Sequence, residues 1–327
     1  MDTLLLQQHI GVHPLQLTRI AMNFPLKQVH DETTRWNLGP VVASLRHSRE
    51  SAHRVRHMGH VRELPSREVI AEVMQGLSAA LFPTHYGRPD LNDENIDFFV
   101  GHTLADTLGK LADQVRRALL FSRSTELPHP EDLQEQAHRV VRSLAEQLPA
   151  IRGLLYSDLQ AAWQGDPAAT GVSELLLCYP GITAVIHHRI AHALFGLGAP
   201  LLARLVADIS HARTGIDIHP GAQIGEGFFI DHGTGVVIGE TSVIGRNVRL
   251  YQAVTLGAKR FPTDDKGHLV KGLARHPIVE DDVVIYAGAT VLGRITIGRG
   301  STIGGNVWLT HSVPAGSNVT QAVSQHN

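Results

Sequence analysis

The segment from residue 279 to residue 309 places an aliphatic side chain at every sixth position. A helix period of 3.6 cannot hold such a run in register, and the strands of a β-sandwich are separated by turns without a fixed period. A triangular coil of parallel strands, with one inward aliphatic on each flat side, requires this spacing. The sequence therefore predicts that the chain ends in a parallel β-helix. The repeating positions are Val279, Ile285, Val291, Ile297, Ile303 and Leu309.

The same spacing occurs earlier and is interrupted twice. Two residues are added between Ile230 and Ile238, and a longer polar segment separates Leu256 from Val279. Both interruptions contain histidine, and long loops in compact folds are usually functional. Glycine often follows the aliphatic, which we interpret as a tight corner where a Cβ would clash or φ must be positive. The earlier inward positions are Ile218, Ile224, Ile230, Ile238, Ile244, Leu250 and Leu256, and the glycines are Gly225, Gly239, Gly245, Gly257, Gly298 and Gly304.

Composition excludes several classes of protein. The 327 residues are 43% hydrophobic with a net charge of -2, which predicts a sizeable core and two domains. No basic excess points to nucleic acid or to an anionic membrane surface, and no run of about 18 apolar residues predicts a membrane span. The single cysteine, Cys178, excludes an internal disulfide. A single cysteine in a sequence without a signal-peptide pattern favours a cytoplasmic location. Because Cys178 follows three leucines, we expect its side chain to pack in the protein interior.

Residues 66–213 show helical periodicity and are predicted to form an all-α domain. Ser66 is the capping residue of a first helix that runs to about Phe82, before Pro83. Residues 1–65 are rich in His and Arg and are expected to form an N-terminal arm. Further helices are expected over about 92–122, 130–148, 151–163, 182–197 and 200–211. The β-helix is expected over 214–319 with a loop at 258–276, followed by a short tail at 320–327.

Five segments of the chain are distinctive: Asp217-Ile-His219-Pro220, Asp231-His232-Gly-Thr-Gly, Arg275-His276-Pro277, Asp166-Pro167-Ala168 and His188-Arg-Ile-Ala-His192. Together they resemble serine O-acetyltransferase, one of the hexapeptide-repeat acyltransferases. The resemblance covers about residues 160–319, and Asp-His-Gly-Thr-Gly combined with Arg-His-Pro is its specific part. The spacing alone does not fix the handedness of the coil. The resemblance implies a left-handed β-helix. It also implies transfer of acetyl from acetyl-CoA to the hydroxyl of L-serine, giving O-acetyl-L-serine in cysteine biosynthesis.

This reaction requires a general base, because a serine hydroxyl is a poor nucleophile until its proton is removed. The resemblance assigns that role to His232 and assigns the orientation of its imidazole to Asp217. His219 is expected to pack beside the first turn of the coil.

The same similarity assigns the substrate contacts. Asp166 and Asp231 would hold the ammonium or hydroxyl of serine, Arg275 its carboxylate, and His276 would complete the pocket. A planar guanidinium suits a carboxylate because it donates two parallel hydrogen bonds. Asp166 could instead cap the next helix.

The resemblance places acetyl-CoA in a groove between neighbouring coils, held largely by main-chain groups. Small residues would allow its close approach, or would simply turn corners. The loop 258–276 could cover the cofactor or attract its phosphates, although a solvated lysine run also explains its charges. No metal is expected. The small residues are Gly257, Ala258, Ala287, Gly304 and Gly305, and the basic loop residues are Lys259, Arg260, Lys266 and Lys271.

A single coil leaves flat sheet faces exposed and the site open on one side, so we expect a homotrimer, which the helical domain could pair into a dimer of trimers. Members of the family insert a terminal isoleucine into O-acetylserine sulfhydrylase. The tail after Pro314 departs from that pattern and reads Gln325-His326-Asn327, so a stable complex is not expected.

Two other functions remain open from the sequence. One is a hexapeptide acyltransferase with a different hydroxyl or amine acceptor. The other is a γ-type carbonic anhydrase, a β-helix in which three histidines bind zinc. That enzyme needs two histidines five positions apart on the coil. The histidines of this region, His219, His232, His268, His276 and His311, contain no such pair.

Overall fold

The computed structural model describes residues 36–52, 56–57, 60–61, 63–122 and 130–321. The chain divides into two units, residues 1–62 and 63–327. The first contains helix α2 (Leu38–Ala52) and an antiparallel pair, β1 (Arg56–His57) and β2 (His60–Val61). Residues 1–35, 53–55, 58–59 and 62 of the expected arm, and the tail from residue 322, lie outside the described residues. No helix in the described ranges is both long and apolar enough to cross a membrane.

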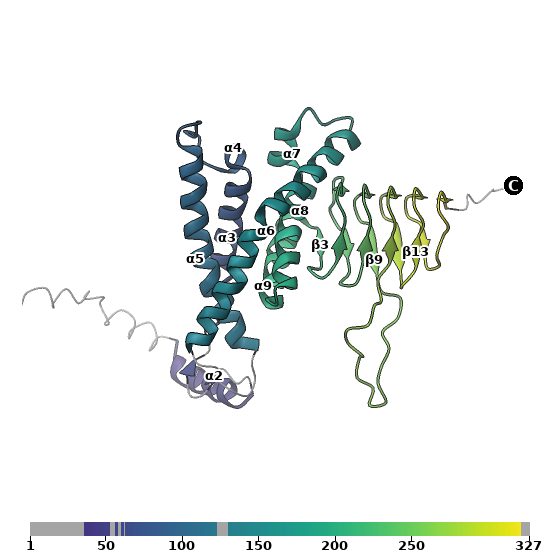
Figure 1. Ribbon diagram of the computed structural model, residues 1–327. Coiled ribbons are helices and arrows are strands. Elements are labelled where there is room, and N and C mark those ends of the chain that lie inside the picture. Colours follow the sequence, from purple (N-terminus) through teal and green to yellow (C-terminus); the bar gives the residue numbers. More distant parts are fainter. Residues whose placement is uncertain (1–35, 53–55, 58–59, 62, 123–129, 322–327) are drawn as a thin grey trace, which may run out of the picture. The chain divides into compact units, whose positions relative to one another are not determined.

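The second unit begins with helices that pack around an aliphatic core (Figure 1). As predicted, the Oγ of Ser66 caps the first of them and accepts a hydrogen bond from the Val69 N–H at 3.3 Å. Leu77, Val115 and Leu144 come from three different helices and are completely buried in this core. The helices are α3 (Arg67–Leu81), α4 (Pro83–Tyr86), α5 (Ile96–Ser122), α6 (Pro130–Gly165), α7 (Val172–Cys178), α8 (Pro180–Gly196) and α9 (Pro200–Thr214).

Two predictions about the helices were wrong. The segments 130–148 and 151–163 are one helix, α6, with Pro149 inside it. An internal proline costs ~3 kcal/mol because it removes a backbone donor and clashes with the preceding turn. Leu148 and Ile151 are both buried, so core packing continues across the proline and outweighs this local cost. Cys178, which we expected to pack, is exposed at the end of α7.

Residues 217–319 form a left-handed parallel β-helix with three flat faces (Figure 1). The predicted inward aliphatics stack from coil to coil: Ile218 lies beside Ile238, and Ile238 beside Leu256. The first face contains β3 (Asp217–Ile218), β6 (Val237–Ile238), β9 (Thr255–Gly257), β12 (Thr290–Leu292) and β15 (Trp308–Leu309). The second contains β4 (Gln223–Ile224), β7 (Val243–Ile244), β10 (Ile278–Val279) and β13 (Thr296–Ile297). The third contains β5 (Phe229–Ile230), β8 (Arg249–Leu250), β11 (Val284–Ile285), β14 (Thr302–Ile303) and β16 (Asn318–Val319).

The glycines that follow inward aliphatics are needed for space and not for an unusual backbone. None of the six has a positive φ, so that half of our interpretation was wrong. A Cβ on Gly225 would lie 2.6 Å from the Gly245 carbonyl oxygen, and one on Gly239 would lie 2.0 Å from His276 Cδ2. Both distances are far inside ordinary contact, so these corners exclude any side chain.

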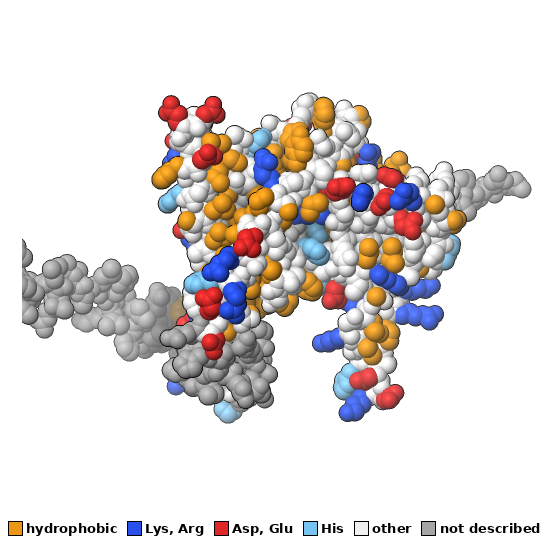
Figure 2. Space-filling model, viewed as in Figure 1, with side chains coloured by type: hydrophobic (Ala, Val, Ile, Leu, Met, Phe, Trp, Pro, Cys, Tyr) orange, Lys and Arg blue, Asp and Glu red, His pale blue; other side chains and the backbone are white. Residues whose placement is uncertain are grey.

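Two edges of the coil flank the first face and carry the predicted functional residues. The residues that follow each third-face strand form what we call the His232 edge: 231–236, 251–254, 286–289 and 304–307. The residues that follow each first-face strand form the Arg275 edge: 219–222, 239–242, 258–277, 293–295 and 310–312. The two residues added after Ile230 widen the first edge. The loop 258–276 extends from the second and carries both hydrophobic and basic side chains (Figure 2).

A buried ion pair fixes the helices to the first coil. Asp158 of α6 and Arg189 of α8 lie 2.9 Å apart. Arg189 also donates to the carbonyl oxygens of Ile224 and Gly225 at 2.5 and 2.6 Å, and Asp158 accepts from the Phe228 N–H at 2.8 Å. Burial raises the pKa of Asp158, and the charge of Arg189 opposes this shift. Because both groups are hydrogen-bonded on several sides, the pair holds α6 and α8 in one orientation on the coil.

Candidate active site

His232 lies at the widened corner of the His232 edge. The chain turns there through left-handed backbone, with φ of 58° at His232 and 90° at Gly233. The imidazole is 69% exposed, and its Nδ1 lies 3.7 Å from Oδ1 of Asp231, which is largely buried. The corner therefore presents a histidine to solvent with one carboxylate beside it.

Within the described residues, no hydrogen bond or ion pair joins Asp217 to His232. Asp217 precedes the inward Ile218 on β3, so its side chain is on the outer side of the first face. An orienting role for Asp217 stays a prediction. His219 packs edge-on against Phe195 with ring centroids 5.9 Å apart, as expected.

Asp166 belongs to the surroundings of the His232 edge. It follows α6 in a turn, and its Oδ2 accepts a hydrogen bond from the Tyr179 hydroxyl at 2.6 Å. This bond lowers the pKa of Asp166, and the nearby His232 acts in the same direction. The same bond raises the pKa of Tyr179 to about 12. Asp166 does not cap α7, whose N-cap is Gly171, so that alternative was wrong.

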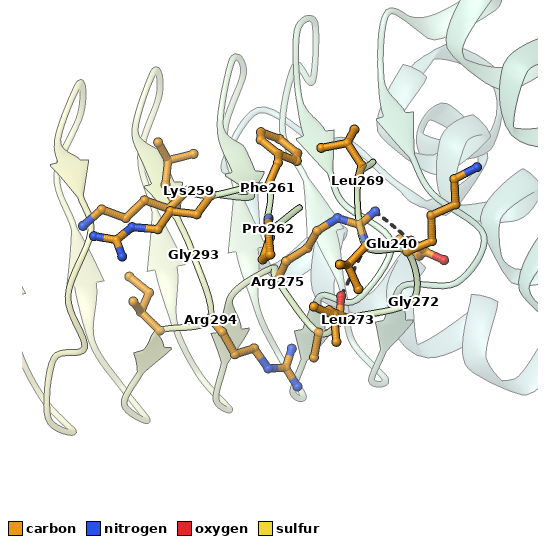
Figure 3. Close-up of a pocket in the computed structure, with 16 residues that line it drawn as sticks. Glu240, Lys259, Phe261, Pro262, Leu269, Gly272, Leu273, Arg275, Gly293 and Arg294 are labelled. Carbon is orange, nitrogen blue, oxygen red and sulfur yellow. Dashed lines mark hydrogen bonds and ion pairs between the residues drawn. The ribbon is translucent and has the colours of Figure 1, made fainter. Parts of the chain in front are cut away.

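Arg275 and His276 end the long loop on the Arg275 edge, where Thr241 of the previous coil fixes both. Thr241 Oγ1 accepts hydrogen bonds from the backbone N–H groups of Arg275 at 2.9 Å and His276 at 3.1 Å. The Arg275 guanidinium is paired with Glu240, with Nη2 and Oε2 2.8 Å apart (Figure 3). Arg294 donates to the carbonyl oxygens of Thr241 and His276 at 2.6 and 3.0 Å. The end of the loop is therefore held rigidly against the coil.

His276 is a buried, neutral imidazole. Burial, assisted by the charge of Arg275, lowers the pKa of His276 to about 4. Its Nδ1 accepts a hydrogen bond from the Thr241 N–H at 3.1 Å, so the proton of the neutral ring is on Nε2. Gly239 leaves the space that the ring occupies. This edge thus offers an Nε2–H donor next to the Arg275 guanidinium.

A cavity of about 660 Å³ lies between the loop and residues 292–295 of the next coil (Figure 3). Its lining is mostly apolar and basic, and its one acidic residue, Glu240, is engaged by Arg275. Such a lining favours a ligand that has an apolar portion and negative charges. The apolar lining includes Phe261, Pro262, Leu269, Val270, Leu273, Leu292 and Ile295, and the basic residues are Lys259, Arg260, Lys271, Arg275 and Arg294.

The predicted site residues form two separate groups in one chain. Asp231 and His232 belong to the His232 edge with Asp166 nearby, whereas Arg275 and His276 belong to the Arg275 edge. The first face lies between them, and across the described residues no side-chain hydrogen bond or ion pair connects the two groups. The predicted small residues divide in the same way. Ala287, Gly304 and Gly305 are on the His232 edge, whereas Gly257 ends β9 and Ala258 follows it on the Arg275 edge.

Sequence reasoning missed the residues that support these groups. Glu240 and Thr241 follow β6 after Gly239, at the same corner as Arg275 and one coil earlier. Because three sides make one full coil, corners that are three sides apart in the sequence stack on each other. This count would have predicted that Glu240 and Thr241 lie close to Arg275. Tyr179 lies outside the coil, so no repeat could have pointed to its contact with Asp166.

The family model described as bacterial transferase hexapeptide (six repeats) matches residues 276–311. The chain is 56% identical over 293 residues to a plasmid serine acetyltransferase of Synechococcus elongatus, covering 88% of this chain and 91% of the relative. It is 48% identical over 166 residues to a serine acetyltransferase of Bacillus subtilis, covering 51% of this chain and 72% of the relative. A crystal structure of serine acetyltransferase 1 from Entamoeba histolytica in complex with L-cysteine is similar with a TM-score of 0.67 and 38% identity, covering 80% of this chain and 88% of that one.

Proposed function

This chain belongs to the serine acetyltransferase family, and from that membership we propose how its two edges divide the reaction. The enzyme transfers acetyl from acetyl-CoA to the hydroxyl of L-serine. The observation that carries our proposal is the exposed imidazole of His232 on one edge and the Arg275–His276 pair on the other.

His232 is the proposed general base. It removes the proton from the serine hydroxyl as the oxygen attacks the thioester carbonyl carbon. The new C–O bond forms, the C–S bond breaks, and the imidazolium returns the proton to the departing thiolate of CoA. Proton transfer by a positioned side chain typically contributes ~10²–10⁴-fold. Asp231 Oδ1 lies 3.7 Å from the imidazole Nδ1, and Asp217 is the proposed orienting carboxylate.

Arg275 is proposed to bind the carboxylate of serine. Its guanidinium already pairs with the Glu240 carboxylate at 2.8 Å, which presents the planar fork in a fixed orientation. Asp166 and Asp231 are proposed to hold the ammonium group, and the lowered pKa of Asp166 keeps that carboxylate ionised. His276 completes the pocket with its neutral Nε2–H donor.

The two groups can act on one serine only if a second copy of the chain contributes. After Asp217 on β3, the outward-facing side chains of the first face carry no charge. One of them, Trp308, is 69% exposed. Packing three coils around an axis would cover this face and place the His232 edge of one copy against the Arg275 edge of the next. We therefore propose a homotrimer with shared sites. The outer residues concerned are Val237, Thr255, Thr290 and Trp308.

Mixed trimers test the shared site directly. Neither His232→Ala nor Arg275→Ala alone should be active. Co-expression of the two variants should restore activity at interfaces where the intact His232 edge meets the intact Arg275 edge, roughly a quarter of them for random mixing. Mixed trimers, verified by two affinity tags, that stay inactive would refute the sharing. Light scattering on the full chain distinguishes a trimer from the proposed pairing of two trimers.

The cavity under the loop fits acetyl-CoA. Its apolar walls suit the pantetheine arm, and Lys259, Arg260 and Lys271 suit the phosphates. In the proposed trimer this cavity faces the small residues of the neighbouring His232 edge. Both surfaces would then line one groove that leads to the reacting thioester.

The Entamoeba relative binds L-cysteine. L-Cysteine differs from L-serine only in the atom that replaces the hydroxyl oxygen, so we infer that it competes for the same ammonium and carboxylate contacts. This supports a place for the reaction in cysteine biosynthesis. The exposed, unpaired thiol of Cys178 suits a reducing compartment and supports a cytoplasmic location. Inhibition by L-cysteine that is not competitive with serine would contradict the shared contacts.

The activity is tested by following the thiol released from acetyl-CoA in the presence of L-serine and identifying the product by mass spectrometry. We expect serine-dependent release and O-acetyl-L-serine. Faster turnover of another hydroxyl or amine acceptor in the same assay would overturn the assignment of serine as the substrate.

A further inference from the structure

Another cavity, of about 490 Å³, lies within the helical domain among α3, α4, α8 and α9. None of its lining residues belongs to either functional edge of the coil. Two of its walls are joined, because Arg67 of α3 forms an ion pair with Asp208 of α9. Small-molecule sites in proteins usually have volumes of ~300–1,000 Å³. The cavity is therefore large enough for a ligand that takes no part in the acetyl transfer.

His187 of α8 brings an unused acceptor to the wall of this cavity. The residue is only 5% exposed, and its Nδ1 donates a hydrogen bond to the Thr183 carbonyl oxygen at 2.8 Å. Burial lowers the pKa of His187, so the ring is neutral and Nε2 is an acceptor. Nε2 has no hydrogen-bond partner among the described residues, yet it is not enclosed by protein atoms. A donor group of a bound molecule can therefore reach it.

Arg213 supplies a positive charge to the same cavity. It is exposed in the last turn of α9, and its guanidinium has no ion pair within the part of the chain that the structure describes. Its charge adds to the effect of burial on the pKa of His187, and it opposes the rise that burial causes in the pKa of Tyr86. Both effects place the guanidinium near these two lining residues. An unpaired guanidinium is suited to a carboxylate, which it can bind through two parallel hydrogen bonds.

The rest of the lining determines what else the ligand carries. Met74, Ile186 and Ile209 form apolar walls, and no acidic side chain is among the described residues that line the cavity, so an ammonium group would be unmatched. We propose that this cavity is a second binding site, separate from the active site, for a small hydroxy-carboxylate with an apolar body, such as a phenolic acid. The carboxylate accepts hydrogen bonds from Arg213, and the hydroxyl donates to Nε2 of His187.

Calorimetric titration of the full chain tests the site with three acids: 4-hydroxybenzoate, 4-hydroxyphenylacetate and 3-(4-hydroxyphenyl)propionate. They differ in the distance between the hydroxyl and the carboxylate. At least one should bind with a Kd below about 1 mM, as expected for a ligand of this size. For that acid, the analogue without the hydroxyl and the neutral carboxamide should each bind about tenfold more weakly.

Two variants assign the contacts. Arg213→Gln should weaken binding of the acid by about tenfold and leave the carboxamide unchanged within about twofold. Arg204→Gln is the matched control, because Arg204 is exposed on the same helix and does not line the cavity. His187→Phe keeps a ring of similar shape and should bind the acid and its deoxy analogue equally. If His187→Phe fails to fold by circular dichroism, the ¹⁵N signal of His187 Nε2 in the wild type replaces it and should shift when the acid is added.

Absence of saturable binding by all three acids would overturn the proposal. Equal weakening by Arg213→Gln and Arg204→Gln would do the same, because it would reduce the effect to the overall charge of the helix. Displacement of the bound acid by L-serine or acetyl-CoA would place it in the active site and would also overturn a separate site. Binding that persists in the presence of both substrates, and that depends on Arg213, supports the proposal.

Discussion

Gly239→Ala should displace the His276 imidazole without changing the backbone. Gly239 has no positive φ, so alanine fits its conformation. The added Cβ would lie 2.0 Å from Cδ2 and 2.1 Å from Nε2 of His276. Carbon contacts are optimal near ~3.5 Å, so the ring has to move by about 1.5 Å. It cannot do so freely, because Thr241 holds its Nδ1 at 2.9 and 3.1 Å.

The magnitude follows from this displacement. A misplacement of about 1 Å at a reacting group costs ~10²-fold, so kcat/KM for serine should fall by about that factor. The overpacking should also lower stability by ~1–3 kcal/mol. Steady-state kinetics and urea denaturation measure the two effects separately. Gly153→Ala is the matched control, because a Cβ at Gly153 in α6 meets nothing within 4 Å. It should leave kinetics unchanged and stabilise the helix slightly.

A second comparison isolates the cause. The His276→Ala variant has no ring to displace. Adding Gly239→Ala to it should therefore lower kcat/KM for serine by less than about threefold relative to His276→Ala alone. An equal loss in both backgrounds would show that Gly239→Ala acts through the coil and not through His276. Retention of more than about half of the wild-type activity by Gly239→Ala alone would refute the steric argument itself.

Four further predictions concern separate residues. His232→Ala should lose ~10²–10⁴-fold in kcat with an unchanged unfolding midpoint, because the side chain is exposed; retention of more than about a tenth of wild-type kcat would exclude this base. Arg275→Lys should raise KM for serine more than KM for acetyl-CoA, because lysine loses the paired donors; equal increases would place Arg275 outside the serine pocket. The pKa of His276 is lowered from 6.5 to about 4, so below pH 6.5 the unfolded chain binds a proton that the folded chain does not. Calorimetry should therefore show the midpoint falling with acidification across this window more steeply in wild type than in His276→Asn, and parallel curves would contradict the shift. Asp158→Asn should cost ~3–5 kcal/mol in urea denaturation because it leaves Arg189 buried without a counter-charge, whereas a cost below about 1 kcal/mol would mean that the pair does not hold the helices on the coil.

The coil was readable from sequence because one physical requirement repeats. Each side buries one aliphatic, so the spacing of Val279, Ile285 and their equivalents reveals both the fold and its register. The helices were less readable because they depend on contacts distant in sequence. Pro149 satisfies the local rule for a helix end, yet buried residues on both sides keep α6 continuous. At Pro149, tertiary packing therefore outweighs the local preference for ending the helix.

The site residues were assigned from resemblance, and their arrangement needed the structure. His232 and Arg275 are both at corners, and nothing in either motif states that the corners belong to different edges. The Thr241–His276 contact and the space left by Gly239 connect residues that are close only because successive coils stack. Whether a side-chain atom finds a partner depends on where its neighbours lie in the folded chain.

The geometry of a β-helix explains why its site is divided. The inward position of every side is taken by a core aliphatic, so functional side chains project only from corners and outer faces. A corner of a triangular coil is convex, and a convex edge cannot surround a substrate. His232 is 69% exposed in the single chain, whereas the base of an acyl transfer needs surroundings that limit competition from water. The long loop adds one wall beside Arg275, but it does not cross the first face to His232. On the proposed shared site, two edges from two copies enclose the substrate, and the column of Ala287 and Gly305 on the His232 edge then forms one side of the groove between them.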